Sequence, residues 1–153
     1  MGIEKNTFRF DVSEFYFRLT TECVRLHSNI CKSYTTINDV VNDRAADAIN
    51  VAKKHPPEYI REHLRLIPTS GDIPIEIIIE ETSATHIDSA SKSISAAIGT
   101  SIEFADALSV IMFDFMYEAN RTEVLSKIGL TLDEARSYRK LLKPDAPGSK
   151  TIN

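Results

Sequence analysis

Two segments of the chain show the alternation of apolar and polar positions that is typical of β-strands. Three apolar residues alternate with three polar ones over residues 7–12: Phe8, Phe10 and Val12 against Thr7, Arg9 and Asp11. This period of two gives the segment one apolar face. Residues 72–81 hold five isoleucines, whose stiff side chains favour a pleated backbone over a helix. Because an unpaired strand leaves backbone groups unsatisfied, we expect the two segments to pair.

Helical periodicity follows the first of these segments. Ser13 offers a cap for a helix over residues 14–28. A second helix is predicted over 36–54, capped by Thr36, and Pro57 begins a short third helix. The polar residues of the second helix are expected to face away from the core: Asn38, Asp39, Asn42, Asp43 and Asp47.

A second helical stretch follows the isoleucine-rich segment. Residues 82–85 offer caps for a helix that ends at Gly99, where a left-handed backbone is tolerated. Residues 100–103 are predicted to form a capping box that opens the next, strongly apolar helix. A further helix is expected over 135–143. Because 144–153 has no apolar pattern, we expect it to be mobile.

The order strand, helix, turn, helix therefore occurs twice. From the start of the strand to the cap of the second helix there are 29 residues (36 − 7) in one copy and 26 (101 − 75) in the other. The predicted fold class is mainly α with a small two-stranded antiparallel ribbon. We expect a strand-helix-helix unit with a short third helix over 1–67. A second unit with the C-terminal helix is expected over 68–143, intertwined with the first in one globular body.

A unit with this order resembles the ribbon-helix-helix family of DNA-binding proteins. In that family two units intertwine, and their paired strands enter the major groove of DNA. The resemblance implies that three outward residues of the first strand contact bases: Thr7, Arg9 and Asp11. It also implies that hydroxyl residues before the second helix of each unit hold backbone phosphates: Thr35, Thr36, Thr100 and Ser101. Two units in one chain would form a monomeric pseudo-dimer, and a homodimer remains open.

The isoleucine-rich strand departs from this family pattern. Its outward face offers either Glu76, Ile78 and Glu80 or three isoleucines. Carboxylates repel phosphates, and isoleucine can contact only a thymine methyl group. An alternative role for Arg9 is therefore an ion pair across the ribbon with Glu76 or Glu80.

Composition and charge restrict the function classes. The chain has 153 residues, of which 42% are hydrophobic and 26% charged, as in one soluble domain. No apolar run reaches the roughly 18 residues of a membrane span, so a cytoplasmic protein without membrane contact is expected. The net charge is −4, but residues 1–67 carry +1 (ten basic, nine acidic) and residues 68–153 carry −5 (eight basic, thirteen acidic). A basic face should therefore lie in the first half, and the acidic half could dock a basic protein.

Candidate catalytic chemistry is scarce. Cys23, His27 and Cys31 recur at helical spacing, but all three cannot reach one ion from one straight helix, so no metal is expected. The sequence contains no nucleophile–base pairing and no glycine-rich phosphate loop, so we expect neither an enzyme nor a cofactor. The favoured function is a DNA-binding accessory or transcription-regulating protein of the kind that plasmids, phages and other mobile elements encode. The alternative is a protein-interaction module or inhibitor that docks a basic partner.

Overall fold

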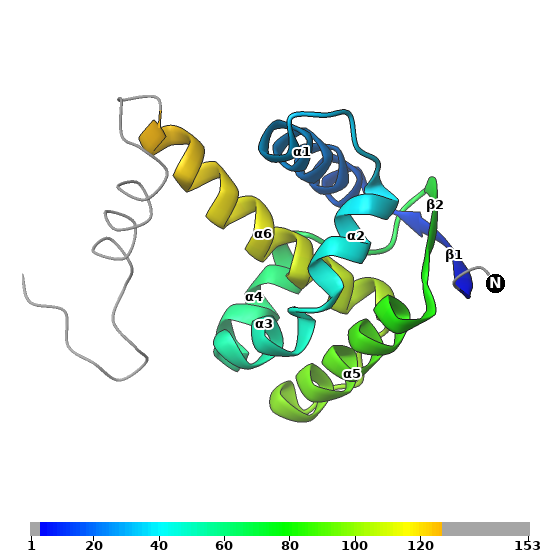
Figure 1. The fold of residues 1–153 in the computed structure, drawn as a ribbon. Coiled ribbons are helices and arrows are strands. Elements are labelled where there is room, and N and C mark those ends of the chain that lie inside the picture. Colours follow the sequence, from blue (N-terminus) through cyan, green and yellow to red (C-terminus); the bar gives the residue numbers. More distant parts are fainter. Residues whose placement is uncertain (1–3, 127–153) are drawn as a thin grey trace, which may run out of the picture. The chain divides into compact units, whose positions relative to one another are not determined.

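The computed structural model describes residues 4–126. The described part contains eight elements: β1 (Lys5–Val12), α1 (Glu14–Cys31), α2 (Ile37–Ala45), α3 (Ala48–Lys54), α4 (Pro57–Leu66), β2 (Ile73–Glu80), α5 (Glu81–Ile98) and α6 (Phe104–Ser126) (Figure 1). The chain divides into two compact units, Met1–Met116 and Tyr117–Asn153. The fold described below is that of the first unit. The helix predicted over 135–143 and the segment 144–153 lie outside the described residues.

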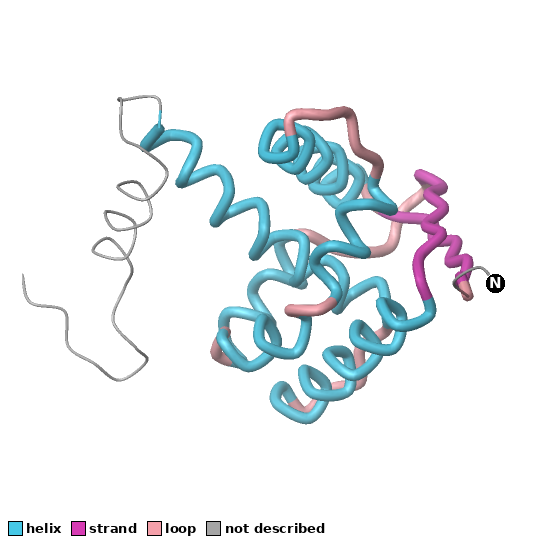
Figure 2. Tube along the Cα trace, viewed as in Figure 1, coloured by secondary structure: helices cyan, strands magenta, loops and turns pink. Residues whose placement is uncertain are grey.

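The two predicted strands pair as one antiparallel ribbon. The register runs from Lys5 opposite Glu80 to Val12 opposite Ile73, which confirms the predicted pairing. Figure 2 shows the two strands side by side at the edge of the helices. Alternation places one face inward, where the Phe8 ring stacks on Phe104 with centroids 4.2 Å apart. The fold is thus mainly helical with a small ribbon, as predicted.

Helix α1 is capped as predicted but extends further than expected. Ser13 accepts a hydrogen bond from the amide of Tyr16, and the helix continues to Cys31 before Lys32 turns left-handed (φ 56°). The sequence prediction ended this helix at Ser28, and that was wrong. The Ser28 hydroxyl accepts a bond from the amide of Thr35 at 3.1 Å, so it ties the following loop to the helix and does not end it.

The single helix predicted over 36–54 is two helices, α2 and α3. The chain bends at Asp47, whose amide donates to the Arg44 carbonyl at 3.1 Å in a tight turn. Apolar residues on both sides of the bend are buried, Ala45 before it and Ala48 after it. The helical period continues through the bend, so the pattern of apolar positions gave no sign of it.

Two predicted caps in the second half of the chain are also wrong. Helix α5 begins at Glu81, directly after β2, so the segment 82–85 lies inside the helix. Helix α6 begins at Phe104, and the amide of Glu103 donates to the Asp106 carboxylate at 2.9 Å, so residues 100–103 do not form the predicted capping box. Gly99, in contrast, ends α5 with φ 74°, as predicted.

The two halves of the first unit repeat the same dimensions. Both α1 and α5 have 18 residues and end at a left-handed residue, Lys32 or Gly99. The next helix starts five residues later in each case, at Ile37 (37 − 32) and Phe104 (104 − 99). The copies are therefore related by a shift of 67 residues (104 − 37). This agreement is closer than the sequence spacing indicated.

The second helix of each copy packs on the other copy. Helix α2 of the first copy contacts β2 and α5 of the second. Conversely, Tyr16 of α1 donates its hydroxyl to the Ala105 carbonyl of α6 at 2.8 Å. The Cys23 thiol of α1 lies 3.3 Å from the Met112 carbonyl, which also belongs to α6. The two copies are thus intertwined around one core.

Candidate nucleic-acid interface

The ribbon presents a small exposed face on the side away from the core. The three residues predicted to contact bases, Thr7, Arg9 and Asp11, are all exposed. The register sets them opposite three exposed residues of β2: Thr7 opposite Ile78, Arg9 opposite Glu76 and Asp11 opposite Pro74. The structure therefore brings the predicted residues together on one face. It also adds three β2 residues that a partner of this face would meet.

Arg9 and Glu76 form an ion pair across the ribbon. Arg9 Nε lies 2.7 Å from Glu76 Oε2, and the two side chains are 76% and 44% exposed. Exposed pairs of this kind contribute at most about 1 kcal/mol, so a polar ligand can replace or join the contact. Glu76 is one of the two alternative partners that the sequence suggested for Arg9.

The free edge of β2 is closed by two asparagines of α2. Asn38 Oδ1 accepts from the Ile78 amide at 2.9 Å, and Asn42 Oδ1 accepts from the Glu80 amide at 3.0 Å. Residues four apart share one face of a helix, so this pair matches two successive outward amides of a strand. The sequence prediction that both asparagines face away was therefore wrong. The contacts fix the ribbon to α2 and close an edge that could pair with another chain.

The end of β1 is held by the turn that precedes β2. The Gly71 amide donates to the Asp11 carbonyl at 3.2 Å, and the Ser13 amide donates to the Thr69 carbonyl at 2.9 Å. A Cβ atom on Gly71 would lie 2.4 Å from the Val12 carbonyl oxygen. Only glycine lets the two backbones approach this closely.

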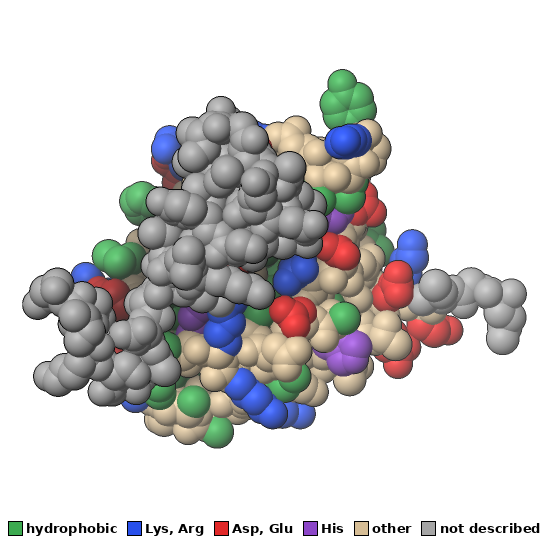
Figure 3. All heavy atoms as spheres, turned by 60° about the vertical axis from the view of Figure 1, so that its left-hand side comes forward, with side chains coloured by type: hydrophobic (Ala, Val, Ile, Leu, Met, Phe, Trp, Pro, Cys, Tyr) green, Lys and Arg blue, Asp and Glu red, His purple; other side chains and the backbone are tan. Residues whose placement is uncertain are grey.

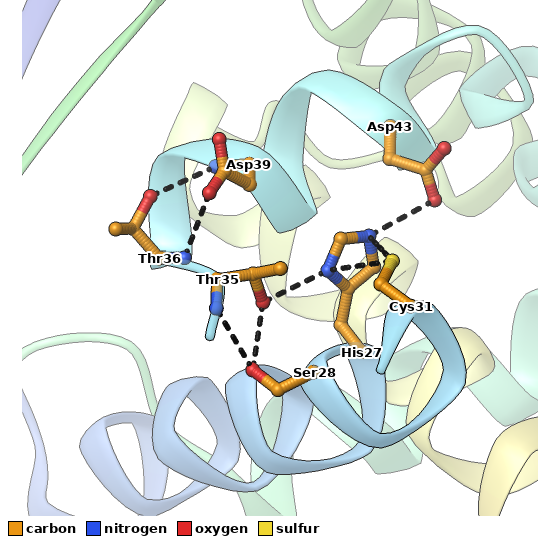
Figure 4. A network of polar contacts seen from close by, with 7 residues as sticks. All are labelled: His27, Ser28, Cys31, Thr35, Thr36, Asp39 and Asp43. Carbon is orange, nitrogen blue, oxygen red and sulfur yellow. Dashed lines mark hydrogen bonds and ion pairs between the residues drawn. The ribbon is translucent and has the colours of Figure 1, made fainter. Parts of the chain in front are cut away.

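Of the four predicted phosphate contacts, two lie at a helix N-terminus. Thr36 caps α2, accepting from the Asp39 amide at 3.2 Å, and the Thr36 amide donates to the Asp39 carboxylate at 2.9 Å (Figure 4). Thr35 lies beside it and bonds to helix α1. Thr100 and Ser101 are exposed in the loop before α6 and do not cap that helix. The start of α2 lies next to the ribbon, because Asn38 binds the backbone of β2.

A hollow lies beside Ile37, the first residue of α2. It has a volume of about 380 Å³ and is lined by residues of α1, α2 and β2: Phe17, Thr20, Thr21, Val24, Ile37, Ile75, Glu76 and Ile77. Most of this lining is apolar, and Glu76 is its acidic member. The hollow therefore borders the outer face of the ribbon at Glu76 and the first turn of α2 at Ile37.

His27, Cys31 and Asp43 lie close together without the geometry of a catalytic group (Figure 4). Cys31 Sγ is 3.9 Å from Nδ1 and 3.8 Å from Nε2 of His27. A thiol that is hydrogen-bonded to one ring nitrogen would lie much closer to it than to the other. His27 Nδ1 instead contacts the Thr35 hydroxyl at 3.0 Å, which anchors the loop before α2. The arrangement is that of a structural contact.

The other cysteine of α1, Cys23, is buried in the core. Burial, followed by the charge of Glu22, raises the pKa of the Cys23 thiol to about 12, which leaves it unreactive. Within residues 4–126, no group of three or more His, Cys, Asp or Glu side chains could hold a metal ion.

A polar cluster in the helical core connects Lys54, His55 and His63 to α6. Asp114 is 6% exposed, and its Oδ1 lies 2.8 Å from Lys54 Nζ and 2.9 Å from His55 Nε2. Burial opposes ionisation of this carboxyl, but the hydrogen bonds from His55 and Lys54 outweigh it and lower its pKa. Burial, and then the charge of His55, lowers the pKa of His63 to about 4. His63 Nε2 bonds to the Ser109 hydroxyl at 2.8 Å.

Comparisons with known proteins add no relative to these observations. Searches of protein-family models, curated proteins and solved structures found no match for the chain. Among the helices of the described part, none is long and apolar enough to cross a membrane.

Proposed function

We propose that the protein is a non-catalytic DNA-binding protein, of the accessory or regulatory kind that plasmids, phages and other mobile elements encode. The observation that carries this proposal is the exposed ribbon face with Thr7, Arg9 and Asp11. The major groove admits a two-stranded ribbon, and these residue types can donate hydrogen bonds to base edges and accept hydrogen bonds from them. The intertwined strand-helix-helix copies support it further, because they provide within one chain the arrangement that the ribbon-helix-helix resemblance implies.

The charge of the ribbon face predicts how such binding would behave. Among its six residues Arg9 is positive and Asp11 and Glu76 are negative, which gives a net charge of −1. Figure 3 brings forward the side of the molecule that lies at the left of Figure 1, away from the ribbon, and the visible acidic and basic groups are interspersed there too. Binding to unrelated sequences should therefore be weak, because that binding depends on neutralised phosphates. Affinity would come from base contacts and from the amides at the start of α2.

The experiment is fluorescence anisotropy with native genomic duplex fragments at low salt, comparing Arg9→Ala with Arg65→Ala. Both arginines are exposed and paired with a glutamate, but Arg65 lies on α4. Arg9→Ala should weaken binding of the preferred fragment about tenfold or more, because a good bidentate base contact contributes discrimination of that size. Arg65→Ala should leave it unchanged. Equal losses in the two variants, or no duplex binding by the wild-type protein, would contradict the proposal.

A second candidate, docking of a basic protein, is favoured by the acidity of the second half. Residues 68–126 hold ten Asp or Glu and two Lys or Arg. Exposed members such as Glu81 and Asp88 lie on α5, whereas Arg9 lies on β1. Cross-linking in a lysate, followed by charge reversal at Glu81 and Asp88, tests this candidate. It predicts loss of a protein partner on charge reversal, with no effect of Arg9→Ala.

A further inference from the structure

The outer face of the ribbon is built on a repeat whose two copies carry different chemistry. With the shift of 67 residues, the outward residues of β1 correspond in chain order to those of β2: Thr7 to Pro74, Arg9 to Glu76 and Asp11 to Ile78. In the register, Arg9 lies opposite Glu76, which is its own counterpart. The local two-fold axis of the repeat therefore passes between these two residues. A symmetric dimer would place two identical side chains there, and this chain places opposite charges.

We infer that the ribbon binds a duplex DNA site without two-fold symmetry, centred on a G·C pair that Arg9 and Glu76 contact together. In this arrangement Arg9 contacts the guanine, Glu76 contacts the cytosine, and Ile78 packs on a thymine methyl group to one side of the pair. The inference rests on the proposed DNA-binding function and specifies the class of site.

The geometry of the ion pair supports the central contact. The closest atoms of the ion pair are Arg9 Nε and Glu76 Oε2, at 2.7 Å, and the Arg9 side chain is 76% exposed. Terminal guanidinium nitrogens match O6 and N7 of guanine, and a carboxylate oxygen matches the N4 amino group of cytosine. Guanine and cytosine present these groups side by side in the major groove when they pair. An Arg–Glu pair is therefore complementary to one base pair in one orientation.

The flanking residues make the two halves of the site unequal. On one side of the central pair, Ile78 lies opposite Thr7 and is 38% exposed, unlike the fully buried Ile77 and Ile79. An exposed isoleucine has no hydrogen bond to offer a base and can only contact the methyl group of thymine. Its counterpart in the first copy, Asp11, can only accept a hydrogen bond, which the amino group of cytosine or adenine can donate. Equivalent positions of the two copies thus require different bases.

The first test is selection of binding sites from a random duplex library by the full chain at low salt. The expected result is a non-palindromic consensus with a fixed G·C pair. Replacing that pair by A·T should weaken binding about tenfold or more in the wild-type protein. The replacement should have little effect on the double variant Arg9→Ala/Glu76→Gln. A palindromic consensus, or one without a fixed G·C pair, would overturn the inference and leave DNA binding intact.

The second test removes the methyl group of thymine and, separately, the side chain of Ile78 beyond Cβ. Deoxyuridine in place of thymidine should weaken binding by wild-type protein about fourfold, the size expected for one buried methyl group. In Ile78→Ala the same replacement should have no effect. An equal loss in both proteins would overturn the assignment of Ile78. Failure to select any duplex would overturn both this inference and the proposed function. Circular dichroism melting verifies that the variants, all at exposed positions, remain folded.

Discussion

At the scale of single residues, polar side chains in the core have partners that their position in the sequence does not reveal. His63 lies on α4 and bonds to Ser109 on α6, and His55 and Asp114 are 59 positions apart in the sequence. The sequence predicts a helix that begins at Pro57 and therefore includes His63. It could not pair His63 with a serine 46 positions away, because that contact depends on how the helices cross.

His63 should make the protein less stable in mild acid. Its pKa in the folded state is about 4, whereas an unfolded histidine titrates near 6.5. The unfolded chain therefore binds the proton first, so the free energy of unfolding should fall as the pH decreases from about 6.5 to about 4, by at most on the order of 3 kcal/mol. His63→Gln should flatten this part of the curve in urea unfolding.

The control for this prediction is His86→Gln, because His86 is exposed on α5. It should leave the pH dependence as in the wild-type protein. A curve for His63→Gln as steep as that of the wild type would show that another group causes the acid instability.

At the scale of elements, the ribbon depends on two attachments, the turn at Gly71 and the asparagines of α2. The added Cβ of Gly71→Ala would meet backbone atoms of Val12 and Ser13, which cannot move aside as a side chain can. We expect a loss of stability of about 2 kcal/mol, typical of a steric clash in a packed site. Thermal or urea unfolding measures it.

Gly99→Ala provides the comparison for Gly71→Ala. A Cβ added at Gly99 would meet no other atom, but the backbone there is left-handed. Gly99→Ala should therefore lower stability by only about 1 kcal/mol. If the two variants were equally stable, the close approach at Gly71 would not be what requires glycine there.

The asparagine pair is expected to protect the edge of β2. Asn38→Ala and Asn42→Ala should each lower stability by about 1 kcal/mol, because each leaves a strand amide without its acceptor. Hydrogen exchange should speed up at Ile78 in the first variant and at Glu80 in the second. Asn50→Ala on α3 removes a bond to Asp47 only and should change neither amide. Unchanged exchange in both ribbon variants would contradict this role.

The sequence predicted elements better than their boundaries or contacts. The alternation in 7–12 and the isoleucines of β2 sufficed for the ribbon, because period-two patterning determines which face is buried. The helical pattern did not reveal the bend at Asp47, because buried alanines continue the helical period on both sides of it. For the candidate site, the outward direction of Arg9 followed from alternation, but the register that sets it opposite Glu76 depends on the whole fold.

At the scale of the whole molecule, the described unit is a repeat folded on itself. Helix α2 of the first copy packs on β2 and α5 of the second copy, and α1 of the first copy contacts α6 of the second. Neither copy therefore completes a core alone. Joining the copies in one chain frees the outer residues of β1 and β2 to differ. The joined copies therefore form an asymmetric ribbon face, with Arg9 and Glu76 at its centre.

The most direct measurement for this account is an NMR titration of the full chain with its best-bound duplex from the site selection. We expect amide shifts concentrated on the ribbon, at Thr7, Arg9, Glu76 and Ile78, and at Ile37 at the start of α2, with α4 and α5 unchanged. Shifts confined to α5 around Glu81 and Asp88, or no shifts at the ribbon, would contradict the account.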